Sequence, residues 1–150
     1  MKPQKCLVSL SDHMSGVEEG DCWRACVATI IETPSHDVPN FVNIAGDDFL
    51  ESTRQWLVER GWAIFARSYG AKGWSFDKLV TWLGGAGPGV ALIVTGRSTD
   101  MEHAVVALNG QVHDPGGCGI TGPHVCTETD CDCGGYWWTY LLTQHHGSTA

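Results

Sequence analysis

The chain has 150 residues, of which 43% are hydrophobic, so it is long enough for one domain with a substantial core. Nine lysines and arginines against 17 aspartates and glutamates give a formal net charge of −8. This charge argues against binding to nucleic acid or to an anionic membrane, because both depend on basic clusters. The sequence holds no apolar run near the roughly 20 residues of a membrane-spanning helix and no signal-peptide pattern at its charged start. We therefore expect a cytoplasmic protein.

The first half of the chain predicts a short strand at residues 6–10 and then helices. Three helices are expected, at residues 22–31, 47–60 and 76–83. The first is apolar on nearly every side and follows Asp21, a good N-cap, which places Cys22 in the first turn of a buried helix. Gly61 is expected to end the second helix and Ser75 to cap the third.

The second half predicts antiparallel strands. They are expected at residues 90–95, 103–108, 111–113 and 136–142. Asn109-Gly110 predicts a tight hairpin that pairs Val106 with His113. Helices followed by antiparallel strands indicate an α+β domain, with the buried first helix packed on the sheet. We expect one domain over residues 1–144, with a long loop rich in cysteine and glycine at 115–134 and a flexible tail at 145–150.

Cysteine, histidine and aspartate occur in an order and setting that suit nucleophilic catalysis. The helix start at Cys22 provides free N–H groups and a partial positive charge, which predict a lowered thiol pKa. His103 opens a strand and is the best candidate for a general base. The hairpin register puts Val105 opposite Asp114, so His103 lies diagonal to that carboxylate and within its reach. His113 is disfavoured as the base, because neighbours on a strand point to opposite faces.

Three blocks of sequence carry a resemblance to a known superfamily: Gly20-Asp21-Cys22-Trp23-Arg24-Ala25-Cys26, His103-Ala104-Val105-Val106 and His113-Asp114-Pro115. They resemble the papain-like cysteine peptidases. The nearest likeness is to the bacterial domains that trim double-glycine leader peptides and to small bacterial and phage proteins with the same blocks. The resemblance implies a papain-like fold, with Cys22 as nucleophile, His103 as base and Asp114 as the group that orients the histidine.

The expected activity is hydrolysis of a peptide or isopeptide bond in a peptide or protein substrate, through a thioester on Cys22. Two alternatives stay open. One is transfer or deamidation by the same triad, and the other is a non-catalytic module that binds peptides or proteins on the same scaffold. The second alternative arises because the superfamily usually supplies an oxyanion-binding Gln shortly before the nucleophile, whereas no Gln lies between Gln4 and Cys22 here. The cysteine-rich loop also favours it. Here the candidates for that donor are Gln4, His13 and Ser15.

The loop at 115–134 contains a second group of polar ligands: Cys118, His124, Cys126, Cys131 and Cys133. Thiolates and an imidazole suit tetrahedral zinc. Their spacing is poor, however, because Cys131 and Cys133 are separated by one residue and Cys118 lies far from the rest. We therefore expect free thiols or loop disulfides ahead of a structural zinc, and no required cofactor.

Overall fold

The structure is a computed structural model of the chain, and it describes residues 3–7, 20–84, 90–98, 101–127 and 131–144. The strand expected at 6–10 is not formed at its described residues, Cys6 and Leu7. Its remaining residues and the tail expected at 145–150 lie outside the described ranges. Among the helices in those ranges, none has the length and apolar character that crossing a bilayer requires.

The described residues form an α+β fold, as predicted. The α-helices are α2 (Cys22–Ile31), α3 (Phe41–Ala45), α4 (Phe49–Val58) and α5 (Phe76–Gly84), with 3-10 turns at Ser35–Asp37 and Gly46–Asp48. The strands are β1 (Trp62–Gly70), β2 (Ala91–Ser98), β3 (Met101–Leu108), β4 (Gln111–His113) and β5 (Tyr136–Gln144). They form one sheet in the order β1-β5-β2-β3-β4, and every neighbouring pair is antiparallel.

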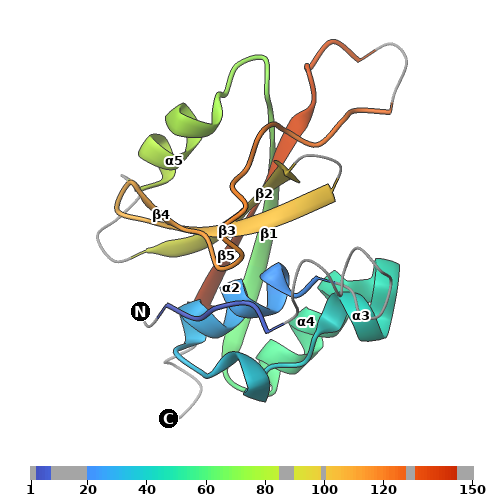
Figure 1. Cartoon of the computed structure of the whole chain (residues 1–150), viewed down its shortest axis with the longest axis vertical. Coiled ribbons are helices and arrows are strands. Elements are labelled where there is room, and N and C mark those ends of the chain that lie inside the picture. The colour runs from blue at the N-terminus through green and yellow to red at the C-terminus, as the bar shows by residue number, and fades with distance from the viewer. Residues whose placement is uncertain (1–2, 8–19, 85–89, 99–100, 128–130, 145–150) are drawn as a thin grey trace.

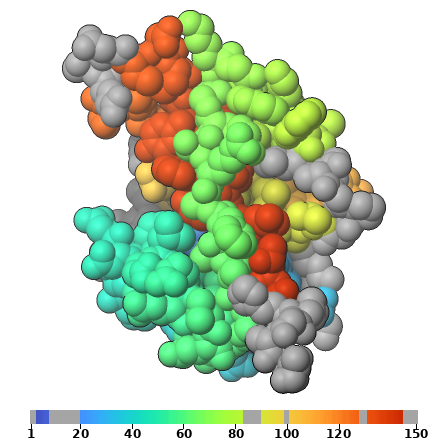
Figure 2. Space-filling model, turned by 180° about the vertical axis from the view of Figure 1, so that it is seen from behind, coloured from blue at the N-terminus to red at the C-terminus, as the bar shows by residue number. Residues whose placement is uncertain are grey.

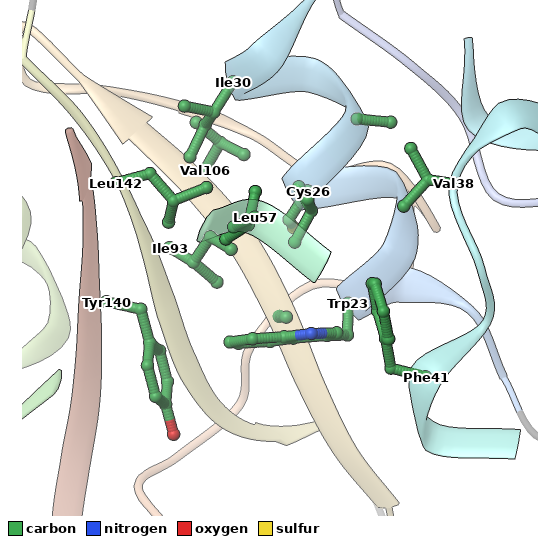
Figure 3. Close-up of a cluster of buried hydrophobic side chains, with 13 residues drawn as sticks. Trp23, Cys26, Ile30, Val38, Phe41, Leu57, Ile93, Val106, Tyr140 and Leu142 are labelled. Carbon is green, nitrogen blue, oxygen red and sulfur yellow. The ribbon is translucent and has the colours of Figure 1, made fainter. Parts of the chain in front are cut away.

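Helices cover both faces of the sheet (Figure 1). Alternate residues of β3 point to opposite faces, as the two-residue period of a strand requires. Val106 joins the core cluster of α2, α3 and α4, whereas Val105 joins the cluster that includes Leu79 of α5. In the first cluster, Trp23 of α2 packs edge-on against Tyr140 of β5, with ring centroids 4.7 Å apart (Figure 3). The buried first helix therefore packs on the sheet, as expected.

Helix α2 has the predicted bounds, but Asp21 does not cap it. No side chain caps this helix, and the buried carboxylate of Asp21 instead accepts hydrogen bonds from the backbone N–H of Leu7 and from the guanidinium of Arg24. Asp21 thus ties the N-terminal segment to the start of the helix. The burial of its apolar residues accounts for the start of the helix, whereas Asp21 binds Leu7 and Arg24 and does not cap the helix.

Two elements were not predicted. The helix expected at 47–60 is preceded by α3, and α4 itself is shorter, at Phe49–Val58. Strand β1 was missed altogether. It lies at an edge of the sheet, and Figure 2 shows it along the middle of one face of the molecule. Its central residues from Phe65 to Ser68 are exposed, so the alternation of polar and apolar residues that marks a half-buried strand is weak there.

The β3-β4 hairpin has the predicted register. Asn109 and Gly110 have φ angles of 52° and 78°, which are the positive values that a tight two-residue turn of this kind requires. The turn pairs Val106 with His113. This pairing fixes the positions of the strand residues on which the candidate site depends.

Candidate active site

The hairpin brings His103 and Asp114 together. Nε2 of His103 donates a hydrogen bond to Oδ1 of Asp114 at 2.6 Å, and the histidine is only 4% exposed. The same carboxylate accepts backbone N–H groups of Gly117 at 2.9 Å and Gly119 at 2.6 Å. Partial burial acts to raise the pKa of the Asp114 carboxyl, but the hydrogen bonds from His103 and these glycines outweigh it and lower the pKa. The aspartate is therefore held as an anion beside the imidazole.

Cys22 begins α2, as predicted, but its thiol pKa is not lowered. Burial raises the pKa to about 11, although backbone hydrogen bonds from Ala104 and Trp23 act in the opposite direction. The prediction of a thiolate stabilised by the helix start is wrong, because the loss of hydration outweighs the favourable backbone groups. The resting form of Cys22 is a neutral thiol.

Cys22 and His103 line one cavity of about 600 Å³. Its wall includes five aromatic side chains and three thiols, which belong to Trp23, Phe49, Tyr136, Trp138, Tyr140, Cys6, Cys22 and Cys118. Trp138 faces this cavity, whereas its neighbour Trp137 is buried in the cluster on the α5 side and donates a hydrogen bond to the carbonyl of Trp74. A pocket of this size, with aromatic walls and a few polar groups, is typical of a ligand-binding site.

Cys118 is the thiol in direct contact with His103. Its Sγ lies 3.6 Å from Nδ1 and 3.5 Å from Nε2. Nearly equal distances to both ring nitrogens place the sulfur against the ring and not in line with either nitrogen, so the contact differs from an ordinary hydrogen bond. The sequence groups Cys118 with the candidate metal ligands of the loop, and no local pattern in it indicates that the loop folds back onto β3.

Gly116 allows that loop to approach. A Cβ atom at this position would lie 3.2 Å from Cε1 of His103, 3.5 Å from Sγ of Cys118 and 3.6 Å from Sγ of Cys6. The absence of a side chain therefore lets two thiols and the imidazole gather around one backbone position. Cys6 is brought in by the N-terminal segment, where its N–H donates to the carbonyl of Pro115.

A chain of polar side chains forms another part of the cavity wall. Nε2 of His124 lies 2.8 Å from the hydroxyl oxygen of Thr95, and Nδ1 lies 3.1 Å from a carboxylate oxygen of Glu102. Tyr140 continues the chain through a hydrogen bond with Thr95, and burial raises the pKa of Tyr140 to about 12. The imidazole of His124 is therefore held by Thr95 and Glu102, and it is not grouped with Cys126, Cys131 and Cys133, although the residue also lines a second cavity beside Cys126 and Cys131. The tyrosine hydroxyl keeps its proton and can act as a donor.

Of the three candidates for a second oxyanion donor, only Gln4 belongs to the described residues, and it does not line the cavity. The backbone of Gln4 binds elsewhere: its N–H donates to Thr29 and its carbonyl accepts from Nε2 of His113. His13 and Ser15 lie outside the described residues. The contact of His113 with Gln4 also directs that imidazole away from the pair formed by His103 and Asp114.

The second group of predicted ligands is divided by the fold. Cys118 and His124 line the cavity, whereas Cys126, Cys131 and Cys133 lie together in a different part of the loop. All seven cysteines fall within the described ranges, and none of them is in a disulfide. The loop disulfides considered from the sequence are therefore not formed in this structure.

Comparison with known proteins does not place the chain in a family. Searches with protein-family models, with curated proteins and with solved structures all gave no match.

Proposed function

We propose that the protein is a thiol hydrolase with a papain-like arrangement, in which Cys22 is the nucleophile, His103 the base and Asp114 its orienting group. One observation carries the proposal. A buried histidine, paired with a carboxylate at 2.6 Å, lines the same cavity as a cysteine at a helix start. A nucleophile, a base and an orienter that converge on one pocket are the parts that acyl transfer requires.

The hydrogen bond to Asp114 leaves Nδ1 of His103 as the basic atom. Because the pKa of Cys22 is raised to about 11, the thiol keeps its proton until a substrate is bound. His103 then removes that proton as the sulfur attacks the carbonyl carbon. The imidazolium formed in this step is stabilised by the Asp114 carboxylate. The enzyme thus works by general-base assistance to a neutral thiol.

The remaining steps return every group to its starting state. The imidazolium gives its proton to the leaving amine, the C–N bond breaks, and a thioester to Cys22 remains. Water, deprotonated by His103, then cleaves the thioester and releases a carboxylic acid and the free thiol. The developing oxyanion would accept hydrogen bonds from the backbone N–H of Cys22 and from a hydroxyl of the cavity wall. Tyr140 is our candidate for this hydroxyl.

The aromatic wall indicates the class of substrate. Trp23, Phe49 and Trp138 contribute apolar surface to the cavity, so a peptide with an aromatic or aliphatic side chain next to the scissile bond would bury that side chain there. Transfer and deamidation use the same covalent step, with an amine as acceptor or a glutamine amide as substrate. We propose hydrolysis of a peptide or isopeptide bond as the primary activity.

A covalent probe tests the nucleophile directly. A panel of peptidyl vinyl sulfones with aromatic or aliphatic side chains should form one adduct, mapped by mass spectrometry to Cys22. The adduct should be absent in Cys22→Ala and His103→Ala and should persist in Cys118→Ala. This last variant is the decisive control, because Cys118 is the thiol that contacts His103.

One structural observation favours the non-catalytic alternative: the thiol that contacts His103 belongs to Cys118 and not to the proposed nucleophile. A binding module would hold peptides of the same composition without forming a covalent bond. Calorimetry with the corresponding unreactive peptides would then show unchanged affinity in Cys22→Ala, and the vinyl sulfones would give no adduct. An adduct on Cys118 would instead move the nucleophile to the loop.

A further inference from the structure

The cysteine loop outside the cavity brings three sulfur atoms together. The Sγ atoms of Cys126, Cys131 and Cys133 all lie within 4.8 Å of one another. Three thiolates bound to one zinc ion at about 2.3 Å in tetrahedral geometry would be separated by roughly 3.8 Å. The observed grouping therefore needs only a small contraction to enclose a cation. A disulfide would instead require two of the sulfurs to approach to about 2.05 Å.

The fold fixes the chain on both sides of this group. His124 and Tyr136 form an isolated antiparallel bridge, with backbone hydrogen bonds of 2.8 Å and 3.0 Å in the two directions. Cys126 follows the first of these residues and Cys133 precedes the second. The carbonyl of Cys133 also accepts the N–H of Lys72 at 2.8 Å, next to the end of β1. Backbone hydrogen bonds thus hold the described residues that flank the three thiols.

The residue types select the cation. Among the described residues, the group contains three thiols and no carboxylate, which suits a thiophilic ion and disfavours calcium or magnesium, because these prefer oxygen. The neighbouring carboxylate of Asp132 lies 3.3 Å from Nζ of Lys72, in an exposed ion pair. Cys131 is exposed, whereas Cys126 and Cys133 are partly buried. No fourth ligand joins the group among the described residues, so we expect water or another exchangeable ligand to complete a tetrahedral ion.

We propose that Cys126, Cys131 and Cys133 bind one zinc ion, with an exchangeable fourth ligand, and that the ion holds the loop in place. The sequence disfavoured zinc on two grounds, the single residue between Cys131 and Cys133 and the distance of Cys118 from the rest, and the fold removes the second because Cys118 is not part of the group. The fold leaves three sulfurs in contact range. Metal binding would also affect the cavity, because the bridge residues His124 and Tyr136 near the cysteines form part of the cavity wall. This inference does not depend on the proposed hydrolase activity.

Elemental analysis and a matched pair of variants test the site. The full chain, purified with a reducing agent and without chelator, should carry about one equivalent of zinc. Cys133→Ser should lose the metal and Cys118→Ser should keep it. The pair is matched because Cys118 belongs to the other group of potential ligands, with His103 and Asp114. Metal lost from Cys118→Ser and kept by Cys133→Ser would overturn the proposal and move the ion to the cavity.

A second measurement on the unmodified sequence keeps the test valid if Cys133→Ser does not fold. The metal-free reduced protein is treated with iodoacetamide, with and without one equivalent of zinc sulfate. Zinc should slow alkylation of Cys126, Cys131 and Cys133 by more than about tenfold and should leave Cys118 unchanged. No protection, protection of Cys118 alone, or a disulfide among the three in freshly purified protein would overturn the site. Stoichiometric copper in place of zinc would overturn the choice of ion.

Discussion

The molecule contains two groups of cysteines that differ in their surroundings. Cys118 contacts a histidine that is hydrogen bonded to an aspartate, and Cys22 lines the same cavity. In the loop, Cys126, Cys131 and Cys133 have one another as neighbours, without an imidazole among the ligands that group with them. The first group is assembled by helix α2 and the β3-β4 hairpin, whereas the second stands on a segment closed by one backbone bridge.

The comparison shows that the groups next to a thiol, and not the cysteine itself, decide which reaction or ligand the thiol is suited to. A thiol beside a base can transfer its proton in a reaction step, which is what a nucleophile requires. Three thiols without a base become thiolates together only if a cation offsets their mutual repulsion, which is what a metal site provides.

Removing the base should have the largest effect. His103→Ala should lower turnover of a cleaved peptide by about 10²–10⁴-fold, the usual contribution of a general base. His113→Ala is the matched control, because this histidine lies on the partner strand and binds the carbonyl of Gln4 instead. It should keep most of the activity. A folded His113→Ala variant without activity, beside an active His103→Ala variant, would reverse the assignment.

The pH dependence of alkylation should show that the thiol of Cys22 is neutral. Because burial raises its pKa to about 11 from an ordinary value of 9.0, its thiolate fraction below pH 9 should be about a hundredfold smaller than in the unfolded chain. The iodoacetamide reaction at Cys22 should therefore accelerate steadily up to about pH 11 in the folded protein. The urea-unfolded protein serves as the reference. A rate that is already constant between pH 6 and pH 8 would instead indicate a preformed thiolate.

Local signals in the sequence predicted the parts of the site that depend on neighbours along the chain. Asn109 and Gly110 accept positive φ angles, and this local property fixed the register that sets His103 diagonal to Asp114. The apolar run of α2 likewise gave the position of Cys22 at a helix start. In both cases the physical cause lies within a few residues of the feature that it produces.

Features that depend on distant parts of the chain were not predictable in this way. Strand β1 pairs with β5, which lies far away in the sequence and supplies most of its contacts. The approach of Cys118 to His103 is eased by the glycine at position 116, because a Cβ there would make a tight contact of 3.2 Å with Cε1 of the imidazole. The raised pKa of Cys22 follows from burial by the assembled cavity. A helix start predicts a lower pKa only where water still reaches the thiol.

Gly96 of β2 offers a test of how tightly the loop segment around Gly122 packs on the sheet. Gly96 pairs with His103 across the sheet, and a Cβ there would lie 2.6 Å from the carbonyl oxygen of Gly122 and 2.7 Å from the ring of Trp137. Gly96→Ala should lower the free energy of unfolding by about 1–3 kcal/mol, as overpacking does. Gly73→Ala, with no atom within 4 Å of the new Cβ, should change it by less than about 0.5 kcal/mol. Urea unfolding of both variants measures this difference. Equal urea midpoints for the two variants would show that the segment around Gly122 shifts to make room for the new side chain.

The smallest expected effect concerns the Asp114 carboxylate under acid. Its pKa is lowered in the folded protein because the hydrogen bonds from His103 and from Gly117 and Gly119 outweigh partial burial. A lowered pKa means that the carboxylate stabilises the fold above its unfolded pKa of about 3.9, and that this contribution is lost as the pH falls through the folded value. Asp114→Asn should therefore be less stable than the unmodified protein at pH 7, and the difference in melting temperature should narrow near pH 3. A difference that stays constant from pH 7 to pH 3 would mean that Asp114 supports the turn through its shape alone, and that its charge adds nothing to the pairing with His103.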